Sequence, residues 1–416
     1  SDPHIDGSVR YSGLTFRDVV VRDTALSFQY RSHTLTLSGD KWRVVKGNKS
    51  LVIDRIIASL GYRSGVIDVH DAEITAGDLT VRMQGEIEPA RGFNAQLTAE
   101  SSGEGRTVSF ITSEPVGGKV NLNGRLAGAL NAPTFEGTIT AGPVIVRKIQ
   151  FNDVNGNVAY QDKKITLSSV DIRRQSARYA FDGTMDMSAP SPVYSARLKV
   201  IQSDVVSIVE LFYDKPLPLV LSASGELSFH GTARNYSGSG RLSLEAGSAY
   251  GESFTHGAVT ALLSTGKIYF PQVVAYKKKG LVRATGWIGF DGTYSADLES
   301  RNISLTAVDG LAGLPFDGDF KLDLHSSGTF SAPAANASLE VEGVSVRGVT
   351  LGRMLAAADL RGGQLKITGG LSDDSVSLSL LWGLRKPYAW TGEAKIRTAD
   401  INPLLLLKNR EVSDRV

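Results

Sequence analysis

The chain has 416 residues, with 45 basic and 43 acidic side chains and no cysteine. The balanced charge argues against a nucleic-acid-binding protein, because such proteins usually carry an excess of basic residues. The lack of cysteine excludes disulfides, thiolate zinc sites, iron–sulfur clusters and a thiol nucleophile. The 44 glycines are spread evenly along the chain, which indicates many turns between strands and not a flexible linker.

A short motif that starts with glycine opens each of four predicted repeat units. It reads Gly-Ser-Val-Arg-Tyr-Ser-Gly at 7–13, and it returns at 118–124, at 225–231 and, in a looser form, at 318–324. Because a chain of repeated units grows along one axis, its function usually lies on a surface that runs through every unit. We predict one continuous elongated domain with a linker at 1–6, repeat units at 7–117, 118–224, 225–317 and 318–408, and a linker at 409–416.

Two further landmarks keep the same order inside the units. A segment at 66–69 lines up with segments at 164–167, 267–270 and 364–367, and an aromatic-led strand follows at 93–97, 194–198, 294–298 and 390–394. Between the two landmarks, the first three units place a glycine at the same distance from the first isoleucine: Gly85, Gly183 and Gly286. The recurrence supports the repeat and carries no chemistry by itself.

Apolar and polar residues alternate along most of the chain. Successive side chains of a strand point to opposite faces, so this pattern gives each strand one apolar and one polar face. Asn-Gly and Asp-Gly pairs at 155–156, 182–183 and 291–292 are typical of tight hairpin turns. The sequence therefore predicts an all-β fold of mostly antiparallel strands in meander order, with a few short helices.

Helical spacing of apolar residues occurs only in short segments. These lie at 53–60, 204–212, 305–311 and 402–407, with Asp204 and Asn402 as candidate N-caps and Pro403 at a first helical position. A short apolar helix at the end of a sheet usually plugs an open end or covers an edge. Contact with lipid is the alternative role.

Motifs for catalysis or metal binding are not found. The sequence has no phosphate-binding loop and no nucleophile elbow, and none of its six histidines has another histidine at metal-ligand spacing. We therefore predict no catalytic residue, no metal site, no cofactor and no enzyme activity. The basic run Lys277, Lys278 and Lys279 is interpreted as a solvated hairpin tip, and contact with anionic lipid headgroups is the alternative.

The apolar faces of four stacked units form one surface with two possible arrangements. The surface is either closed into a dry core between two sheets, or the sheet folds lengthwise and leaves an apolar trough. Acyl chains suit such a trough, since each methylene moved out of water contributes about 0.8 kcal/mol. The candidate lipid-groove residues are Ile67, Val69, Val120, Leu122, Leu126, Ile165, Leu167, Leu227, Phe229, Ile268, Phe270, Leu322, Leu324, Leu365, Ile367, Leu378 and Leu380.

The chain resembles the AsmA and TamB group of large periplasmic proteins from residue 7 to residue 407. The resemblance rests on the glycine-bounded strands, on the Asn-Ala-Pro and Ser-Ala-Pro spacers at 131–133 and 331–333, and on units that close at 204–212 or 402–407. The stretch 118–139 is closest to the TamB-like style. The resemblance implies an elongated sheet folded lengthwise into a U-shaped groove, or β-taco, with an apolar interior.

The same resemblance implies a function and a location. Such proteins are anchored in the inner membrane and cross the periplasm, and they are held to carry phospholipid to the outer membrane. The expected role is thus a non-enzymatic lipid conduit in the cell envelope, on the periplasmic side of an anchor outside this sequence. Proteins of the TamB-like branch are also linked to outer membrane biogenesis, so the resemblance implies an outer-membrane barrel of the Omp85 type as a partner.

Two alternatives remain at the level of sequence. One is a chaperone or scaffold for outer-membrane protein assembly, in which a client strand pairs with an open sheet edge. The other is a closed β-repeat stalk or adhesin with a dry interior and no bound lipid.

Overall fold

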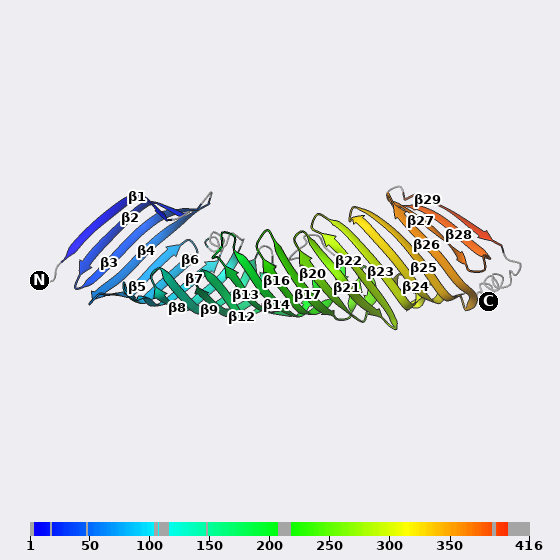
Figure 1. Cartoon of the computed structure of the whole chain (residues 1–416), viewed down its shortest axis with the longest axis horizontal. Coiled ribbons are helices and arrows are strands. Elements are labelled where there is room, and N and C mark those ends of the chain that lie inside the picture. The colour runs from blue at the N-terminus through cyan, green and yellow to red at the C-terminus, as the bar shows by residue number, and fades with distance from the viewer. Residues whose placement is uncertain are drawn as a thin grey trace, which may run out of the picture. The chain divides into compact units, whose positions relative to one another are not determined.

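The computed structural model describes residues 4–16, 19–46, 49–103, 107, 116–146, 149–206, 218–384 and 388–397. Most of these residues lie in β-strands, which confirms the all-β prediction. The chain divides into two compact units, Ser1–Lys199 and Val200–Val416. Figure 1 shows the strands of each unit as long ribbons that lie side by side.

The first unit is a meander in which strands adjacent in sequence pair with one another. Its strands are β1 (Ile5–Phe16), β2 (Val19–Arg31), β3 (Thr34–Lys46), β4 (Lys49–Arg63), β5 (Val66–Ala76), β6 (Leu79–Glu88), β7 (Gly92–Gly103), β8 (Val116–Ala129), β9 (Ala132–Val146), β10 (Ile149–Phe151), β11 (Asp153–Gln161), β12 (Lys164–Arg174) and β13 (Ala177–Asp186). The described ladders from β1 to β13 are antiparallel, as predicted. Strand β14 (Val193–Asp204) follows and reaches into the residues of the second unit.

The second unit repeats this arrangement. Its main strands are β16 (Ser222–Gly231), β17 (Tyr236–Leu244), β20 (His256–Ser264), β21 (Lys267–Lys277), β22 (Gly280–Gly289), β23 (Thr293–Ser304), β24 (Phe316–Thr329), β25 (Ala332–Val346), β26 (Val349–Arg361), β27 (Gln364–Leu371), β28 (Val376–Gly383) and β29 (Trp390–Ile396). Three short strands, β15 (Leu219–Val220), β18 (Gly247–Ala249) and β19 (Glu252–Phe254), form a separate small sheet. The described ladders of both sheets are antiparallel.

Tight turns with left-handed residues join many of the strands. Asp162 and Lys163 have φ angles of 50° and 62°, which is the two-residue geometry that matches the twist of a hairpin. The predicted turn at 291–292 does join β22 to β23. The predicted turns at 155–156 and 182–183 are wrong, because these residues lie inside β11 and β13.

The misread Asn-Gly pair lies at a bulge. The register of β11 against β12 shifts between Asn155 and Asn157, and a Cβ on Gly156 would lie 2.6 Å from Val170 Cγ2. A bulge brings two backbones close together, so it favours glycine for the same reason that a turn does. The Asn-Gly pair therefore does indicate a position that favours glycine, but a β-bulge and a tight turn both have this preference.

The three glycines that recur in the sequence have the same position in the ladders. They lie opposite an apolar residue in the pairs Val69–Gly85, Leu167–Gly183 and Phe270–Gly286. In each ladder the register shifts directly after this pair. Such a bulge bends its strand and increases the local twist, so the sequence repeat encodes a repeated bend in the sheet.

The helix predictions have mixed outcomes. Residues 305–311 contain two 3-10 helices, η1 (Leu305–Ala307) and η2 (Asp309–Leu311), which confirms a short helical segment there. The Asp204 carboxylate accepts the Val206 N–H at 3.2 Å, as expected of an N-cap. Residues 207–212 and 402–407 lie outside the described residues.

The predicted helix at 53–60 is wrong, because these residues lie in β4. Ladders with β3 and β5 flank this strand and satisfy its backbone on both sides. Ile56, Ala58 and Leu60 then alternate onto one face, so tertiary pairing overrides the local helical spacing. No helix in the described part of the chain combines the length and apolarity that crossing a membrane requires.

Candidate functional surface: one apolar face

In the first unit, cross-strand register gathers apolar side chains on one face of the sheet. Leu122 of β8 lies opposite Ala99 of β7 and Ile139 of β9. Directly paired residues of neighbouring strands point to the same side, so these residues define a common face, which we call the apolar face. In the first unit it carries the predicted groove residues Ile67, Val69, Val120, Leu122, Leu126, Ile165 and Leu167.

The second unit has an apolar face built in the same way. Leu324 of β24 lies opposite Leu298 of β23 and Ala337 of β25. Directly paired residues extend this face across the strands from β16 to β29. It holds the remaining predicted groove residues Leu227, Phe229, Ile268, Phe270, Leu322, Leu324, Leu365, Ile367, Leu378 and Leu380.

The predicted groove residues remain partly accessible to solvent. Of the seventeen, Val69 is buried, whereas the other sixteen are half-buried or exposed, and Leu378 reaches 48% exposure. Apolar side chains between two packed sheets would instead be buried. Fully buried residues do occur, such as Val341 at 0% exposure. Each unit therefore offers a broad apolar surface that is in part open.

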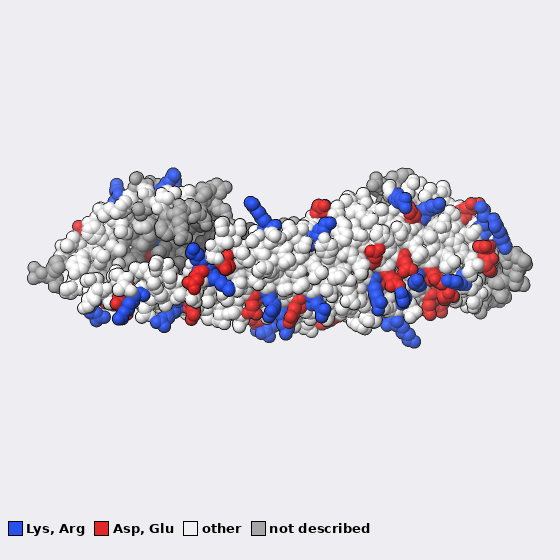
Figure 2. Space-filling view, in the orientation of Figure 1, with Lys and Arg blue, Asp and Glu red and all other residues white. Residues whose placement is uncertain are grey.

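The opposite face of each sheet is polar. Lys119, Asn121, Asn123 and Arg125 alternate with the apolar residues of β8 and are exposed. Acidic and basic side chains lie next to one another in the view of Figure 2. On neighbouring strands β5 and β6, Arg82 Nε lies 2.9 Å from Glu73 Oε2. Cross-strand pairs of opposite charge support the sheet modestly.

The polar face of the second unit contains a hollow of about 830 Å³ over β22–β27. Its polar lining includes Arg283, Asp297, His325 and Lys366, and His325 Nδ1 lies 2.7 Å from Asp297 Oδ1. Among the described residues, no group of three or more histidines and carboxylates is arranged to hold a metal ion. Within the hollow, His325 and Asp297 thus pair with each other.

The basic run at 277–279 divides into one buried and two exposed lysines. Lys278 and Lys279 are exposed in the turn between β21 and β22. Lys277 is buried, and its Nζ lies 2.7 Å from Glu252 Oε2 and 2.8 Å from Asp309 Oδ2. The interpretation of this run as a solvated tip is therefore wrong for Lys277, because two carboxylates far away in sequence surround its ammonium group.

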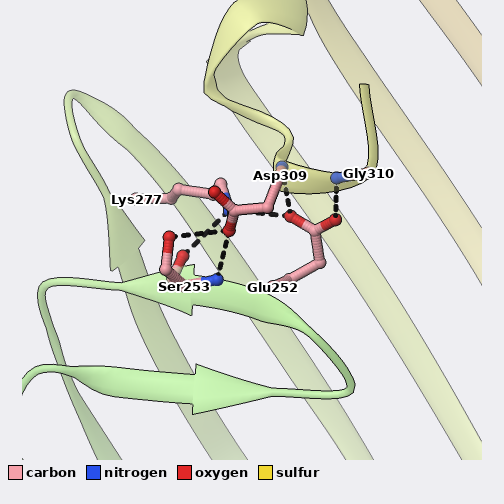
Figure 3. A network of polar contacts seen from close by, with 5 residues as sticks. All are labelled: Glu252, Ser253, Lys277, Asp309 and Gly310. Atoms are coloured by element: carbon pink, nitrogen blue, oxygen red, sulfur yellow. Dashed lines mark hydrogen bonds and ion pairs between the residues drawn. The ribbon is translucent and has the colours of Figure 1, made fainter. Parts of the chain in front are cut away.

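This network links three elements of the second unit (Figure 3). Asp309 Oδ2 also accepts the Ser253 Oγ–H at 2.7 Å, and Glu252 Oε1 accepts the Gly310 N–H at 3.1 Å. The β18–β19 hairpin is thus tied to η2 and to the end of β21. Sequence reasoning missed the network, since no local pattern relates these residues.

The network shifts the pKa of each charged member. The pKa of Asp309 lies far below its ordinary value because the Lys277 ammonium and the Ser253 N–H and O–H donate to it. Burial alone would raise the pKa of Glu252, but hydrogen bonds from Lys277, Asp309 and Gly310 hold it below its ordinary value. Burial alone would lower the pKa of Lys277, but both carboxylates hold it above its ordinary value.

No family model matches the chain, and neither a curated protein nor a solved structure is significantly similar to it.

Proposed function

We propose that this protein is a non-enzymatic lipid carrier that holds acyl chains on its apolar face. The observation that carries the proposal is the register, which places all seventeen apolar candidates on the same face of their unit. Partial exposure of these side chains supports it, because a surface that binds acyl chains must be reachable from water.

The physical basis is the hydrophobic effect. An acyl chain in water exposes each of its methylenes, and burial of one methylene contributes about 0.8 kcal/mol. Leu, Ile, Val and Phe side chains form non-directional van der Waals contacts, so an acyl chain can slide along them without breaking hydrogen bonds. A row of such side chains on successive strands therefore provides a path and not a single pocket.

The sequence resemblance extends the proposal to a biological setting. By analogy with the AsmA and TamB group, the lipid is a phospholipid, and the protein carries it across the periplasm between the inner and outer membranes. The analogy also implies a membrane anchor and a partner protein in the outer membrane, and neither belongs to the described residues.

A second candidate is the scaffold for outer-membrane protein assembly, and the edge strand β29 favours it. Among the described strands, β29 pairs with β28 alone, and all seven of its residues are exposed. An open edge of this kind can accept an extended client strand through main-chain hydrogen bonds.

Photo-crosslinking on β8 tests the lipid proposal. A photoreactive amino acid is placed at Leu122 on the apolar face or, as a matched control, at Asn121 on the polar face. After irradiation in cells, we expect phospholipid adducts at position 122 and none at position 121. Adducts at neither position would contradict the proposal and favour the scaffold or a closed stalk.

A further inference from the structure

A meander has two rows of turns, one at each end of its strands. We call the first turn row those turns that follow β2, β4, β6, β8, β11 and β13 in the first unit and β16, β20, β22, β24, β26 and β28 in the second. The second turn row lies at the opposite strand ends, and its described turns follow β5, β12, β21, β25 and β27. The two rows differ in their side chains.

Aromatic residues mark the apolar face beside the first turn row. Tyr62, at the end of β4, lies opposite Ile67 and is 69% exposed. Trp390, at the start of β29, lies opposite Trp382 and is 70% exposed. Such residues in the two units include Tyr30, Tyr62, Phe93, Tyr160, Tyr236, Tyr294, Trp382 and Trp390. Phe135 lies opposite Tyr160 on the same face, but it is buried.

An exposed cation accompanies five of these aromatic residues within three positions in sequence. The pairs are Tyr30 with Arg31, Tyr62 with Arg63, Phe93 with Arg91, Tyr160 with Lys163, and Tyr236 with Arg234. Tyr294 is an exception, because its turn contains Asp291. An aromatic residue of the apolar face with an exposed cation nearby in sequence thus occurs four times in the first unit and once in the second.

Two of these cations, Arg63 and Arg91, have weak partners. Arg63 Nη2 lies 3.8 Å from Asp68 Oδ2, and Arg91 Nε lies 3.5 Å from Glu88 Oε1. The two arginine side chains are 78% and 84% exposed. Exposed ion pairs contribute little, so an anionic group of a ligand can replace these carboxylates at small cost.

In its described part, the second turn row has this combination at Tyr179, which lies on the apolar face opposite Ile172 and next to the exposed Arg178. This pair differs from those of the first row, because Tyr179 is only 6% exposed and Arg178 Nε lies 2.6 Å from Asp171 Oδ1. Other strand ends of the second turn row carry aliphatic residues on the apolar face, such as Ile74 opposite Val81. Several of its turns hold acids that already accept hydrogen bonds, for example Asp78 from Ser101 and Asp373 from Ser375. Lys278 and Lys279 are exposed there, but no aromatic residue of the apolar face lies beside them.

Tyr and Trp prefer the boundary between acyl chains and headgroups, where the ring is in an apolar layer and the polar atom reaches water. Arginine binds phosphate through two parallel hydrogen bonds. We propose that the first turn row holds the phosphate groups of bound lipids, with the acyl chains lying from there across the apolar face. This inference rests on the proposed function and adds the orientation of the lipid and its anionic headgroup.

Two photoactivatable phosphatidylglycerol analogues test the orientation on the full chain. One carries its diazirine at the end of an acyl chain and the other carries it in the headgroup. We expect the acyl probe to label peptides from the middle of β8 and β9, and the headgroup probe to label peptides that contain Arg63 or Arg91. Headgroup labelling of the second turn row, or equal labelling of both rows, would overturn the inference. Absence of labelling by the acyl probe would instead reject the proposed function itself.

Charge removal tests the role of phosphate. The double variant Arg63→Gln with Arg91→Gln should bind phosphatidylglycerol vesicles about thirtyfold more weakly, because each of the two cations near an anionic lipid surface contributes on the order of 1 kcal/mol. The matched variant Lys278→Gln with Lys279→Gln should bind as the parent does. Neither variant should change binding of diacylglycerol with the same acyl chains, and both should unfold at the parent temperature. Equal losses in the two variants, or loss of diacylglycerol binding, would contradict phosphate recognition by the first turn row.

Discussion

Val69 lies directly opposite Gly85, and the ladder between β5 and β6 shifts its register immediately beyond this pair. Gly85 has a φ of 143°, and a Cβ at this position would meet the backbone of β7. Gly85→Ala should therefore destabilise the chain by about 1–3 kcal/mol, through backbone strain and steric overlap. Urea unfolding followed by circular dichroism measures this loss.

Gly103→Ala is the control for that measurement. Gly103 does not have a positive φ, and apart from its chain neighbours no atom of the described residues lies within 4 Å of a Cβ built on it. The stability of this variant should stay within about 0.5 kcal/mol of the parent. Equal effects of the two substitutions would mean that the bulge places no special demand on residue 85.

The Lys277 network predicts a local loss of structure when its cation is removed. In Lys277→Met, the carboxylates of Glu252 and Asp309 lose the ammonium group that lies within 2.8 Å of both. We expect faster hydrogen exchange in the β18–β19 hairpin, and exchange in β8 should not change. Unchanged protection of the Ser253 amide would show that the hairpin is held by other contacts.

The same network predicts a specific pH dependence for Asp309→Asn. The pKa of Asp309 is lowered in the folded state, so the carboxylate stabilises the fold above its ordinary pKa, near 3.8, and this contribution is lost as the pH falls below it. The pKa of Lys277 is raised, so its contribution is present below about pH 10 and is lost as the pH rises further.

Thermal unfolding across this pH range checks the sign. Asp309→Asn should be less stable than the parent between about pH 5 and 10, and the difference should shrink below about pH 4. A difference that stays constant from pH 3 to pH 8 would show that the substitution acts through packing and not through charge.

An open apolar face and a dry core respond differently to truncation. Val341 is fully buried between Phe320 and Met354, so Val341→Ala should cost about 2 kcal/mol. Leu322→Ala removes one carbon more from a partly exposed position, yet it should cost less than Val341→Ala, because no sealed cavity forms at a site that solvent or lipid can reach. Urea unfolding of both variants measures which substitution lowers the free energy of unfolding more. A larger loss at Leu322 would indicate a sealed core.

An acidic residue on the apolar face should block lipid and leave the fold intact. Leu122→Asp places a carboxylate among Ala99 and Ile139, where its desolvation disfavours acyl chains. We expect at least tenfold weaker binding of a fluorescent fatty acid. Asn121→Asp on the polar face of the same strand is the matched control, and equal losses in both variants would argue against a role for the apolar face.

Much of the architecture follows from local pattern. Alternation along β8 assigns Leu122 and Asn121 to opposite faces without any structure, because the side-chain period of a strand is two residues. The recurring Gly85, Gly183 and Gly286 likewise mark equivalent places in the ladders. These features depend on neighbours in sequence, and that is why the sequence could predict them.

Only the tertiary structure decided which residues meet across the sheet. Residues 53–60 have helical spacing, but pairing with two flanking strands makes them part of β4. Lys277 meets Asp309 and Glu252 through loops that no periodic pattern describes. The two-residue period of the sequence thus determines which side chains of a strand share a face of the sheet. The burial of a charge and the choice between helix and strand depend instead on residues that are distant in sequence and that the fold brings into contact.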